Sequence, residues 1–342
     1  MPSPWHFVIL ANAHWEAAGG GQPSRQLARG LGKLRIPYVY LNPLDRWVTQ
    51  RRALRRLDPG HALVVCELPT RNFLRICRML RQRGAVTIYR KIDPWEIMPE
   101  NHWYDPATEK ALLKSVDIVL AHSPTLLRQI RAVRPDAELE PNAVDVEQFR
   151  RLCNRPPRDL VQGSVTVGFW GTFFADWFDW RVIVQAASKL GGVAFNLIGA
   201  RTPIVESHRP KLPPNVHLLG AKPWEDLYRY LSFFDVCVIP YRRTPVTARI
   251  QPVKALEYLA GGKPVVSFWN TALAELPYFL FYRNSSDFIR CIHIARSVSV
   301  NQRDVRSFLE ARSLRAQVRR YANRADEVAR RRGPHGCQES CS

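Results

Sequence analysis

The sequence predicts an α/β protein built from two doubly wound parallel sheets in tandem. Its 342 residues suit two domains of ordinary size. Short apolar runs alternate with segments of helical period, which is typical of βα units around parallel sheets. Between two series of such runs, residues 153–163 are polar, proline-rich and aperiodic, as expected of an interdomain linker. Because such sheets bind ligands at the carboxyl ends of their strands, two facing sheets would form an interdomain cleft.

Each apolar run is an expected strand, and the runs set the domain boundaries. In the first half the expected strands are 5–11, 38–41, 62–67, 85–89 and 117–122. In the second half they are 165–169, 194–198, 216–219, 235–240, 264–268 and 278–282. We therefore expect a first domain over 1–152, the linker over 153–163, a second domain over 164–300, a basic helix over 301–332 and a flexible tail over 333–342.

Composition excludes several classes of protein. With 46% hydrophobic and 23% charged residues, the chain is not disordered as a whole. Its apolar runs, such as 236–240, are far shorter than the roughly 20 residues of a membrane-spanning helix. Residues 1–11 have no basic leader and no cleavage site follows them, so we expect no signal peptide and a cytoplasmic protein.

Seven scattered cysteines predict neither a disulfide framework nor a zinc site, since no two form a Cys-x-x-Cys pair. Cys66 and Cys237 fall in expected strands, where a free thiol is usually a small core residue. Cys337 and Cys341 fall in the expected tail, at a spacing that is unusual for a metal site.

The charge of the chain points to an anionic partner. Fifty basic and thirty acidic residues give a net charge of +20, and residues 25–90 alone carry fifteen basic and three acidic residues, a net +12. A membrane surface, a phosphorylated substrate or a nucleic acid would each attract such a segment. Nucleic acid is not favoured, because the sequence contains no zinc finger, RRM signature or basic-region heptad.

Three stretches of helical period concentrate the basic residues. They are 47–57, 71–83 and 303–332, the last with ten basic and four acidic residues. Such helices either pack an apolar side on the core or lie on an anionic bilayer. The basic residues of the first stretch are Arg51, Arg52, Arg55 and Arg56.

Glycines precede the first expected helix of the chain. Gly19, Gly20 and Gly21 could offer backbone N–H groups and a helix N-terminus to a phosphate or an acceptor. The loop is neither GxGxxG nor a P-loop, and a flexible loop is an equally good interpretation.

The stretch 244–266 is the most informative of the second half. A helix that starts near Pro252 would place Lys254 in its first turn and Glu257 one turn later, at the end that faces a ligand. Lysine can neutralise a diphosphate, and a carboxylate can accept both hydroxyls of a ribose. Gly261 and Gly262 would end this helix. These residues alone fit a solvated Lys/Glu pair equally well.

The segment PVKALEYLAGGKPVV at 252–266 resembles the donor-site helix of GT-B glycosyltransferases related to glycosyltransferase family 4. Further matches follow the family's order and together span roughly residues 5–285, densely in the second half and thinly in the first. They are the glycine loop with 25–28, PNAVD at 141–145 with Phe149, the run 215–227 and the strand 234–241.

The resemblance implies two Rossmann-like domains in the GT-B arrangement, the second of which binds a nucleotide-diphosphate sugar. By position, Glu257 would hold the donor ribose and Lys254 the diphosphate. Gly171, Lys222 and Pro252 would complete the donor site. Residues 174–179 look like a variant found in a subgroup that builds bacterial cell-surface polysaccharide.

Two departures from the family pattern stand out. Arg249 occupies the position of the family's paired glutamate, so sugar contacts of that partner are missing, and Ala143 replaces the usual glycine of PNGVD.

The resemblance also implies an acceptor side in the first domain. The candidate catalytic residues there are His14, Glu16 and Asp93, at expected strand ends. In a retaining transferase the leaving phosphate oxygen can take the acceptor proton, so we expect these groups to orient the acceptor hydroxyl. A lone His or Asp at a strand end is also commonly an ordinary cap or surface group.

We therefore expect a retaining glycosyltransferase with a lipid-linked or glycan acceptor, attached peripherally to the inner face of the cell membrane. No cofactor and no metal are expected, since the sequence has no Asp-x-Asp pair. A sugar-nucleotide epimerase of the same fold and a basic nucleic-acid-binding protein remain as alternatives, and analysis of products from a labelled nucleotide sugar distinguishes them.

Overall fold

The computed structural model describes residues 5–15, 21–55, 57–98, 101–173 and 176–333. The described chain divides into two compact units. The first holds most of the N-terminal half together with 312–333, and the second holds 144–311 together with Gly21. Each unit is built on one six-stranded sheet.

All strand pairs in the first unit are parallel, in the order β2-β1-β3-β4-β5-β6. The sequence predicted every strand except the two-residue β6. The strands are β1 (His6–Leu10), β2 (Tyr38–Leu41), β3 (Ala62–Cys66), β4 (Val86–Lys91), β5 (Ile118–Ala121) and β6 (Glu138–Leu139). Chain order reverses between β1 and β3, so the strand ends there form the position where ligands bind in this class of sheet.

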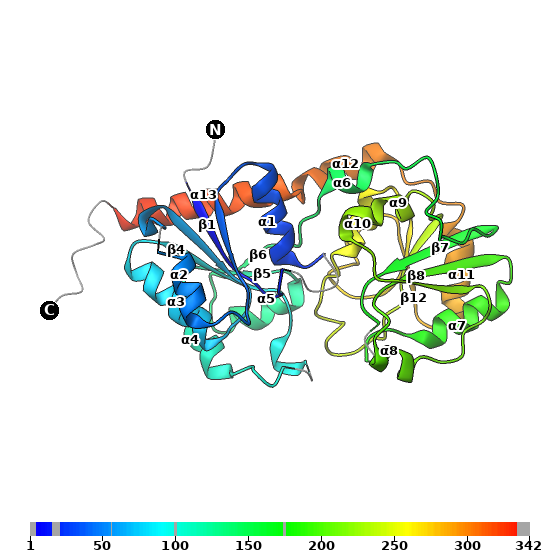
Figure 1. The fold of residues 1–342 in the computed structure, drawn as a ribbon, viewed down its shortest axis with the longest axis horizontal. Coiled ribbons are helices and arrows are strands. Elements are labelled where there is room, and N and C mark those ends of the chain that lie inside the picture. Colours follow the sequence, from blue (N-terminus) through cyan, green and yellow to red (C-terminus); the bar gives the residue numbers. More distant parts are fainter. Residues whose placement is uncertain (1–4, 16–20, 56, 99–100, 174–175, 334–342) are drawn as a thin grey trace. The chain divides into compact units, whose positions relative to one another are not determined.

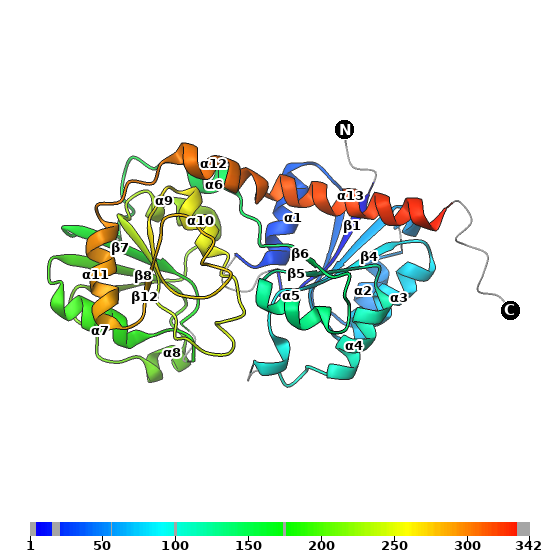
Figure 2. The same cartoon turned by 180° about the vertical axis from the view of Figure 1, so that it is seen from behind.

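Helices cover both faces of the first sheet (Figures 1 and 2). Alternate residues of β1 point to opposite faces, and both faces are buried, so its run of apolar residues is continuous. Phe7 packs in one core with residues of α1 (Pro23–Lys33) and α13 (Leu314–Arg332), whereas Val8 belongs to a second core with residues of α3 (Arg71–Gln82), α4 (Pro106–Ser115) and α5 (Pro124–Arg131). The remaining helical segments are α2 (Trp47–Ala53) and the short turns η1 (Pro59–His61) and η2 (Trp95–Ile97).

The second unit has the strand order β12-β11-β10-β7-β8-β9, again with parallel pairs. All six strands were predicted. They are β7 (Val165–Trp170), β8 (Val193–Ile198), β9 (Val216–Gly220), β10 (Val236–Ile239), β11 (Val265–Phe268) and β12 (Phe279–Tyr282). The helical segments are α6 (Val146–Arg150), α7 (Trp180–Lys189), α8 (Pro203–His208), η3 (Trp224–Asp226), α9 (Leu227–Leu231), α10 (Lys254–Ala260), α11 (Ser285–Ala295) and α12 (Gln302–Ala311).

The expected linker, 153–163, packs on the second unit. The Asn196 side chain donates to the Val161 carbonyl (2.8 Å) and accepts from the Val161 N–H (3.0 Å). The Cys153 N–H donates to the Ser232 hydroxyl at 3.0 Å. The boundary between units therefore falls after Ala143, earlier than the expected boundary at 152.

The expected basic helix, 301–332, consists of two helices in different units. Helix α12 ends at Ala311 and belongs to the second unit, and α13 belongs to the first. The break is encoded locally, because the Ser313 hydroxyl accepts a hydrogen bond from the Ala316 N–H and so starts a new helix.

The basic stretches differ in how much charge they expose. In α13, Arg320 and Arg324 pair with buried Glu140, and Arg332 pairs with Asp117. These arginines therefore hold α13 to its own unit, rather than all extending an exposed basic face.

The first basic stretch is helical only to Ala53, so α2 is shorter than the expected 47–57. Arg51, Arg52 and Arg55 are exposed, while Arg56 lies outside the described residues. In α3 the predicted apolar residues are buried, including Phe73 and Leu80.

The structure describes part of the chain for two further expectations, on membrane-spanning helices and on cysteines. No helix in the described ranges is long and apolar enough to cross a membrane. The five cysteines in these ranges are unpaired thiols, of which Cys66 and Cys237 are buried in strands as expected. Cys337 and Cys341 lie outside the described residues.

Candidate functional site

The second unit brings Lys254 and Gly171 together, as the donor-site hypothesis requires. Gly171 directly follows β7 and has φ +144°, a backbone conformation that residues with a side chain rarely adopt. A Cβ built on it would lie 2.9 Å from Cε of Lys254. The Lys254 ammonium donates to the Tyr241 hydroxyl at 2.7 Å and lies 5.1 Å from the centre of that ring. A cation therefore lies beside exposed backbone at a strand end, which suits a phosphate.

Glu257 lies one turn beyond Lys254 and is almost completely buried, at 1% exposure. Its Oε2 accepts from the indole N–H of Trp170 and its Oε1 from that of Trp224, both at 2.9 Å. This indole pair, Trp170 and Trp224, fixes the plane of the carboxylate. Sequence reasoning singled out Glu257 but missed its partners, which are 87 and 33 residues away in the chain.

Aromatic packing holds the indole pair in place. Phe149 of α6 stacks on Trp170, with ring centres 5.8 Å apart, and meets Trp224 edge-on at 5.4 Å. The Tyr258 hydroxyl accepts from the backbone N–H of Trp170 at 3.0 Å. Rings in such edge-on and stacked contacts stabilise one another by about 0.5–1.5 kcal/mol beyond burial. The carboxylate of Glu257 is thus held by a rigid support.

The remaining donor-site candidates occupy different positions. Pro252 is buried two residues before the start of α10, and its carbonyl accepts a hydrogen bond from the Ala255 N–H. Lys222 instead forms an ion pair with Asp159 (2.6 Å). Gly21 groups with the second unit, where a Cβ on it would lie 3.5 Å from Oε1 of Glu257.

Three further candidates lie outside the described residues, namely Glu16, Gly19 and Gly20. Arg249, which replaces the family's paired glutamate, donates to the Pro245 carbonyl at 2.5 Å. In the part of the chain that the structure describes, no three His, Cys, Asp or Glu side chains are grouped as metal ligands would be. Metal independence stays a prediction.

In the first unit, Asp93 lies just beyond β4, partly buried at the carboxyl edge of the sheet. Burial and, to a smaller extent, the charge of the neighbouring Glu67 raise the pKa of its carboxyl to about 8, against the opposing effect of the Arg90 guanidinium. A carboxyl that titrates near neutral pH is typical of functional sites.

Sequence reasoning missed three buried polar residues at the same sheet edge: Glu67, Arg90 and His122. Arg90 donates to Oε1 of Glu67 at 3.1 Å, and burial raises the pKa of that carboxyl. Burial, followed by the Arg90 charge, lowers the pKa of His122 to about 3, so its ring is neutral at physiological pH. Glu67 and His122 directly follow apolar strands, which is the signal that could have identified them.

His14 lies in the loop after β1, where its carbonyl accepts a hydrogen bond from the buried Arg25 guanidinium. The contact fixes the backbone of this loop to α1. It leaves the role of the imidazole a prediction.

The second unit is similar to a known family of proteins. Residues 164–292 match the family model described as "Glycosyl transferases group 1". The chain is also 26% identical over 186 residues to TuaH of Bacillus subtilis, whose name assigns it to teichuronic acid biosynthesis as a glycosyltransferase. That alignment covers 52% of this chain and 47% of TuaH, so it spans less than half the length of the relative.

Solved structures match over nearly the whole chain. HepE from Anabaena, solved in complex with UDP-glucose, has a TM-score of 0.68 at 13% identity and covers 94% of this chain and 99% of its own. An α,α-trehalose-phosphate synthase from Burkholderia vietnamiensis has a TM-score of 0.66 at 13% identity and covers 97% and 100%. Together with the two parallel six-stranded sheets, these matches show that the chain has the GT-B fold and that residues 164–292 of its second unit resemble the group 1 glycosyltransferases.

Proposed function

We propose that this protein transfers a sugar from a nucleotide-diphosphate sugar to a glycan or lipid-linked acceptor, and that its second unit binds the donor. The observation that carries the proposal is the arrangement around α10, where Lys254 lies beside Gly171 and the carboxylate of Glu257 is held one turn away. A cation and a carboxylate at this separation match the diphosphate and the ribose of one nucleotide.

Each group has a separate role toward the donor. The Lys254 ammonium would neutralise the diphosphate, and the missing side chain at Gly171 would let a phosphate approach the backbone. A carboxylate offers about four lone-pair sites, so each oxygen of Glu257 can accept more than the one hydrogen bond that it accepts from the indole pair. Because the indole pair already fixes the carboxylate, little conformational freedom would be lost when the ribose binds.

We propose a retaining reaction without a metal ion. Lys254 supplies positive charge where a metal would otherwise act on the diphosphate. A leaving phosphate oxygen would take the acceptor proton, and Asp93 would orient the acceptor hydroxyl as a hydrogen-bond acceptor once its carboxyl is ionised.

The acceptor is proposed to belong to cell-surface polysaccharide synthesis. The similarity to TuaH supports this class. The sequence variant at 174–179 points the same way, although residues 174 and 175 lie outside the described part of the chain.

Attachment to an anionic membrane surface completes the proposal. Around α2, the exposed Arg51, Arg52 and Arg55 accompany two apolar side chains, Leu44 and Val48, which are 84% and 75% exposed. Basic and apolar groups together on one segment are what an interfacial segment requires. Such contact would bring a lipid-linked acceptor to the enzyme on the cytoplasmic side.

The proposal is tested first by binding and then by product analysis. Titration with UDP, GDP, ADP and dTDP should raise the melting temperature for one of them, because a ligand at 100 times its Kd stabilises by about 2.7 kcal/mol. The corresponding labelled sugar nucleotide is then incubated with a membrane extract. Label in lipid or glycan supports the proposal, whereas an epimerised nucleotide sugar without transfer refutes it.

A further inference from the structure

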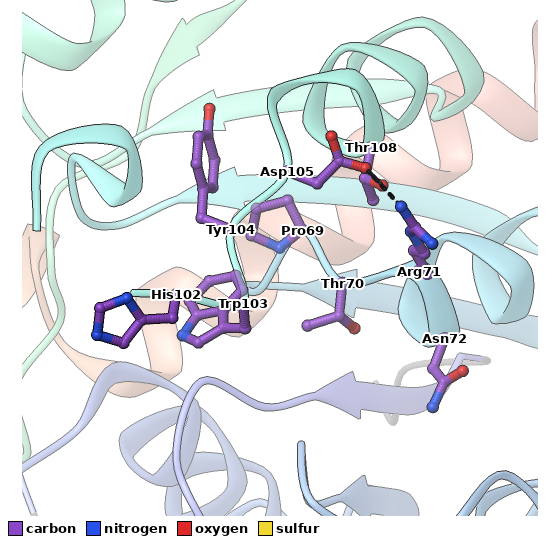
Figure 3. A pocket seen from close by; sticks show the side chains of 9 residues that line it. All are labelled: Pro69, Thr70, Arg71, Asn72, His102, Trp103, Tyr104, Asp105 and Thr108. Atoms are coloured by element: carbon purple, nitrogen blue, oxygen red, sulfur yellow. Dashed lines mark hydrogen bonds and ion pairs between the residues drawn. The ribbon is translucent and has the colours of Figure 1, made fainter. Parts of the chain in front are cut away.

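The first unit contains an open cavity of about 480 Å³ whose lining includes none of the site residues predicted from the sequence (Figure 3). Two segments of the chain line it, one leading from β3 into α3 and the other leading into α4. Its volume lies in the range of about 300–1,000 Å³ that small-molecule sites occupy. The lining residues are Pro69, Thr70, Arg71, Asn72, His102, Trp103, Tyr104, Asp105 and Thr108.

An exposed aromatic ring forms one side of this cavity. Trp103 is 41% exposed, although it contacts two other rings. Its centre lies 5.7 Å from that of the buried Trp95 and 6.3 Å from that of Tyr104. The indole is thus supported from within the protein while part of its surface faces solvent. An indole held in this way offers a flat apolar face to a ligand and keeps its N–H as a donor.

Polar side chains face the ring across the cavity. In Figure 3, Arg71 and Asp105 point toward each other on one side, and His102 and Trp103 lie on the other. The Arg71 guanidinium and the Asp105 carboxylate are 3.5 Å apart. Among the described residues, the side-chain amide of Asn72 and the ring of His102 have no hydrogen-bond partner. Donors and acceptors are therefore available beside the aromatic surface.

Hydrogen bonds behind the cavity hold its wall in one conformation. The Tyr104 hydroxyl donates to Glu109 at 2.6 Å, and Lys91 donates to both oxygens of the same buried carboxylate. Asp105 accepts from the Ala107 N–H at 3.0 Å. A wall that is fixed before binding lowers the entropic cost of taking up a ligand.

The charge of the lining favours an uncharged ligand over a phosphate. The Arg71 guanidinium and the Asp105 carboxylate form an ion pair, so the opposite charges of the lining offset each other and leave no excess positive charge for an anion. The same carboxylate can accept hydrogen bonds from hydroxyl groups, and Arg71 and Asn72 can donate them. An aromatic face with planar polar side chains around it suits a sugar ring, which has an apolar face and a rim of hydroxyls.

We propose that this cavity binds a pyranose unit of the acceptor glycan, with the sugar ring stacked on Trp103 and its hydroxyls bonded to Asn72, Arg71 and Asp105. The inference rests on the proposed function and extends it to the acceptor. Trp103 is connected to the strand end where the reacting hydroxyl is expected, because it contacts Trp95, which follows Asp93 by two residues in the chain. The sugar bound here is not the one that reacts. Its binding positions the rest of the acceptor glycan for transfer.

The first test measures sugar binding without turnover. Saturation-transfer difference NMR is recorded with methyl glycosides of glucose, galactose, N-acetylglucosamine, N-acetylgalactosamine and glucuronic acid. We expect at least one of the neutral glycosides to bind, and we expect Trp103→Ala to raise its Kd about tenfold through loss of the stacking contact. Trp103→Phe keeps an aromatic face and should retain most of the affinity.

The polar side of the cavity is tested with two variants of arginines on α3, one in the lining and one outside it. Arg71→Gln removes a lining residue, and Arg75→Gln removes an exposed arginine one turn further along α3 that does not line the cavity. We expect only the first to weaken glycoside binding. Equal effects of the two variants, binding of none of the glycosides, or an unchanged Kd in Trp103→Ala would each overturn the proposal.

The second test separates this inference from the proposed function. In a transfer assay, Trp103→Ala should raise the KM for the glycan acceptor and leave the Kd for the nucleotide unchanged. If transfer occurs with an unaltered acceptor KM, the proposed function stands and the sugar site is refuted. If the glycosides bind but no transfer is found with any donor, the sugar site stands and the proposed function fails.

Discussion

Lys254 and Glu257 lie one turn apart on α10, but their surroundings differ. Lys254 is partly exposed beside Gly171, whereas Glu257 is buried and accepts hydrogen bonds from two indoles. One indole N–H donates to each oxygen of the buried carboxylate, so the orientation of the Glu257 side chain is fixed. Charge at Lys254 is therefore available to a ligand, and the carboxylate provides a fixed acceptor.

We predict different kinetic defects for the two residues. Lys254→Ala should lower kcat/KM by about 10²–10³, because diphosphate charge develops in the transition state without compensation. Glu257→Gln should mainly raise the nucleotide Kd, by about tenfold or more, since it weakens hydrogen bonds to a charged acceptor. Steady-state kinetics and nucleotide titration measure both effects. Near-native values in the two variants would refute the donor-site assignment.

The prediction for Asp93 follows from its pKa. Below about pH 8 the carboxyl is protonated and cannot accept a hydrogen bond from the acceptor hydroxyl through an ionised oxygen. The value of kcat/KM should therefore rise with pH and level off above about 8, and Asp93→Asn should remove this rise. A wild-type profile that is flat between pH 6 and about 9 would contradict the role.

Stability provides an independent measurement of the same pKa. The folded carboxyl holds its proton up to about pH 8, whereas the unfolded chain releases it near 3.8. The free energy of unfolding should thus fall as pH rises through this window, and Asp93→Asn should lessen the fall. Denaturant melts of both proteins at several pH values test this.

The site residues that the sequence predicted are those that follow from local pattern. Lys254 and Glu257 lie in a segment with helical period and glycines at its end. The sequence therefore predicts a helix in which the two residues are one turn apart. The indole pair could not be predicted, since Trp170 at the end of β7 and Trp224 in η3 reach Glu257 of α10 only when these three elements pack together. The cavity at Trp103 was missed for the same reason, because its lining comes from two loops.

At the scale of elements, strands were the most predictable part of the fold. Strands such as β3 and β7 are buried on both faces, so each forms an uninterrupted apolar run. The missed strand β6 has two residues, one of them Glu138, and no such run. The break between α12 and α13 at Ser313 was also missed. Basic residues and the helical spacing of apolar residues continue on both sides of it, so the sequence predicted one helix.

Helix α13 is held to its unit by charge as well as by apolar packing. Burial would raise the pKa of Glu140, but hydrogen bonds from Arg320 and Arg324 lower it overall. Such a carboxyl contributes stability above its unfolded pKa of about 4.5, and this contribution is lost as pH falls further.

We predict that Glu140→Ala destabilises the protein by about 3–5 kcal/mol, because it leaves two arginines without their buried partner. Glu138→Ala is the matched control, since Glu138 also pairs with Arg324 but is 53% exposed. Its cost should be at most about 1 kcal/mol. Thermal and urea melts at neutral pH compare the two, and the difference should shrink toward pH 3. Equal losses would show that the buried pair is not the main contact.

At the scale of the whole molecule, the chemistry is expected to proceed without a metal. The sequence has no Asp-x-Asp pair to hold an ion on a diphosphate, and Lys254 offers a cation in its place. We expect transfer activity to survive treatment with EDTA and not to rise when Mg²⁺ or Mn²⁺ is added. Activity that disappears with the chelator and returns with either ion would refute metal independence.

The distribution of charge makes the membrane proposal more specific than the net charge of +20 suggests. Some basic residues of the 25–90 segment are internal, because Arg25 and Arg90 are buried. In α13, Arg320, Arg324 and Arg332 are ion-paired. The exposed charge beside apolar groups is concentrated around α2, so this segment is the expected contact.

We therefore predict that the protein cosediments with phosphatidylglycerol vesicles and that binding weakens as salt rises, because exposed charges are screened within about 8 Å at physiological ionic strength. Replacing Arg51, Arg52 and Arg55 with Gln should cost about 3 kcal/mol, or about a hundredfold in affinity, at about 1 kcal/mol for each basic residue. The control replaces three exposed arginines of the second unit, Arg155, Arg158 and Arg296, and removes the same charge. Nucleotide binding should be unchanged in both variants. If the control variant loses as much vesicle binding as the α2 variant, attraction by net charge explains the effect and the assignment to α2 is wrong. If the wild type does not bind these vesicles at low salt but binds nucleic acid tightly, the membrane proposal fails.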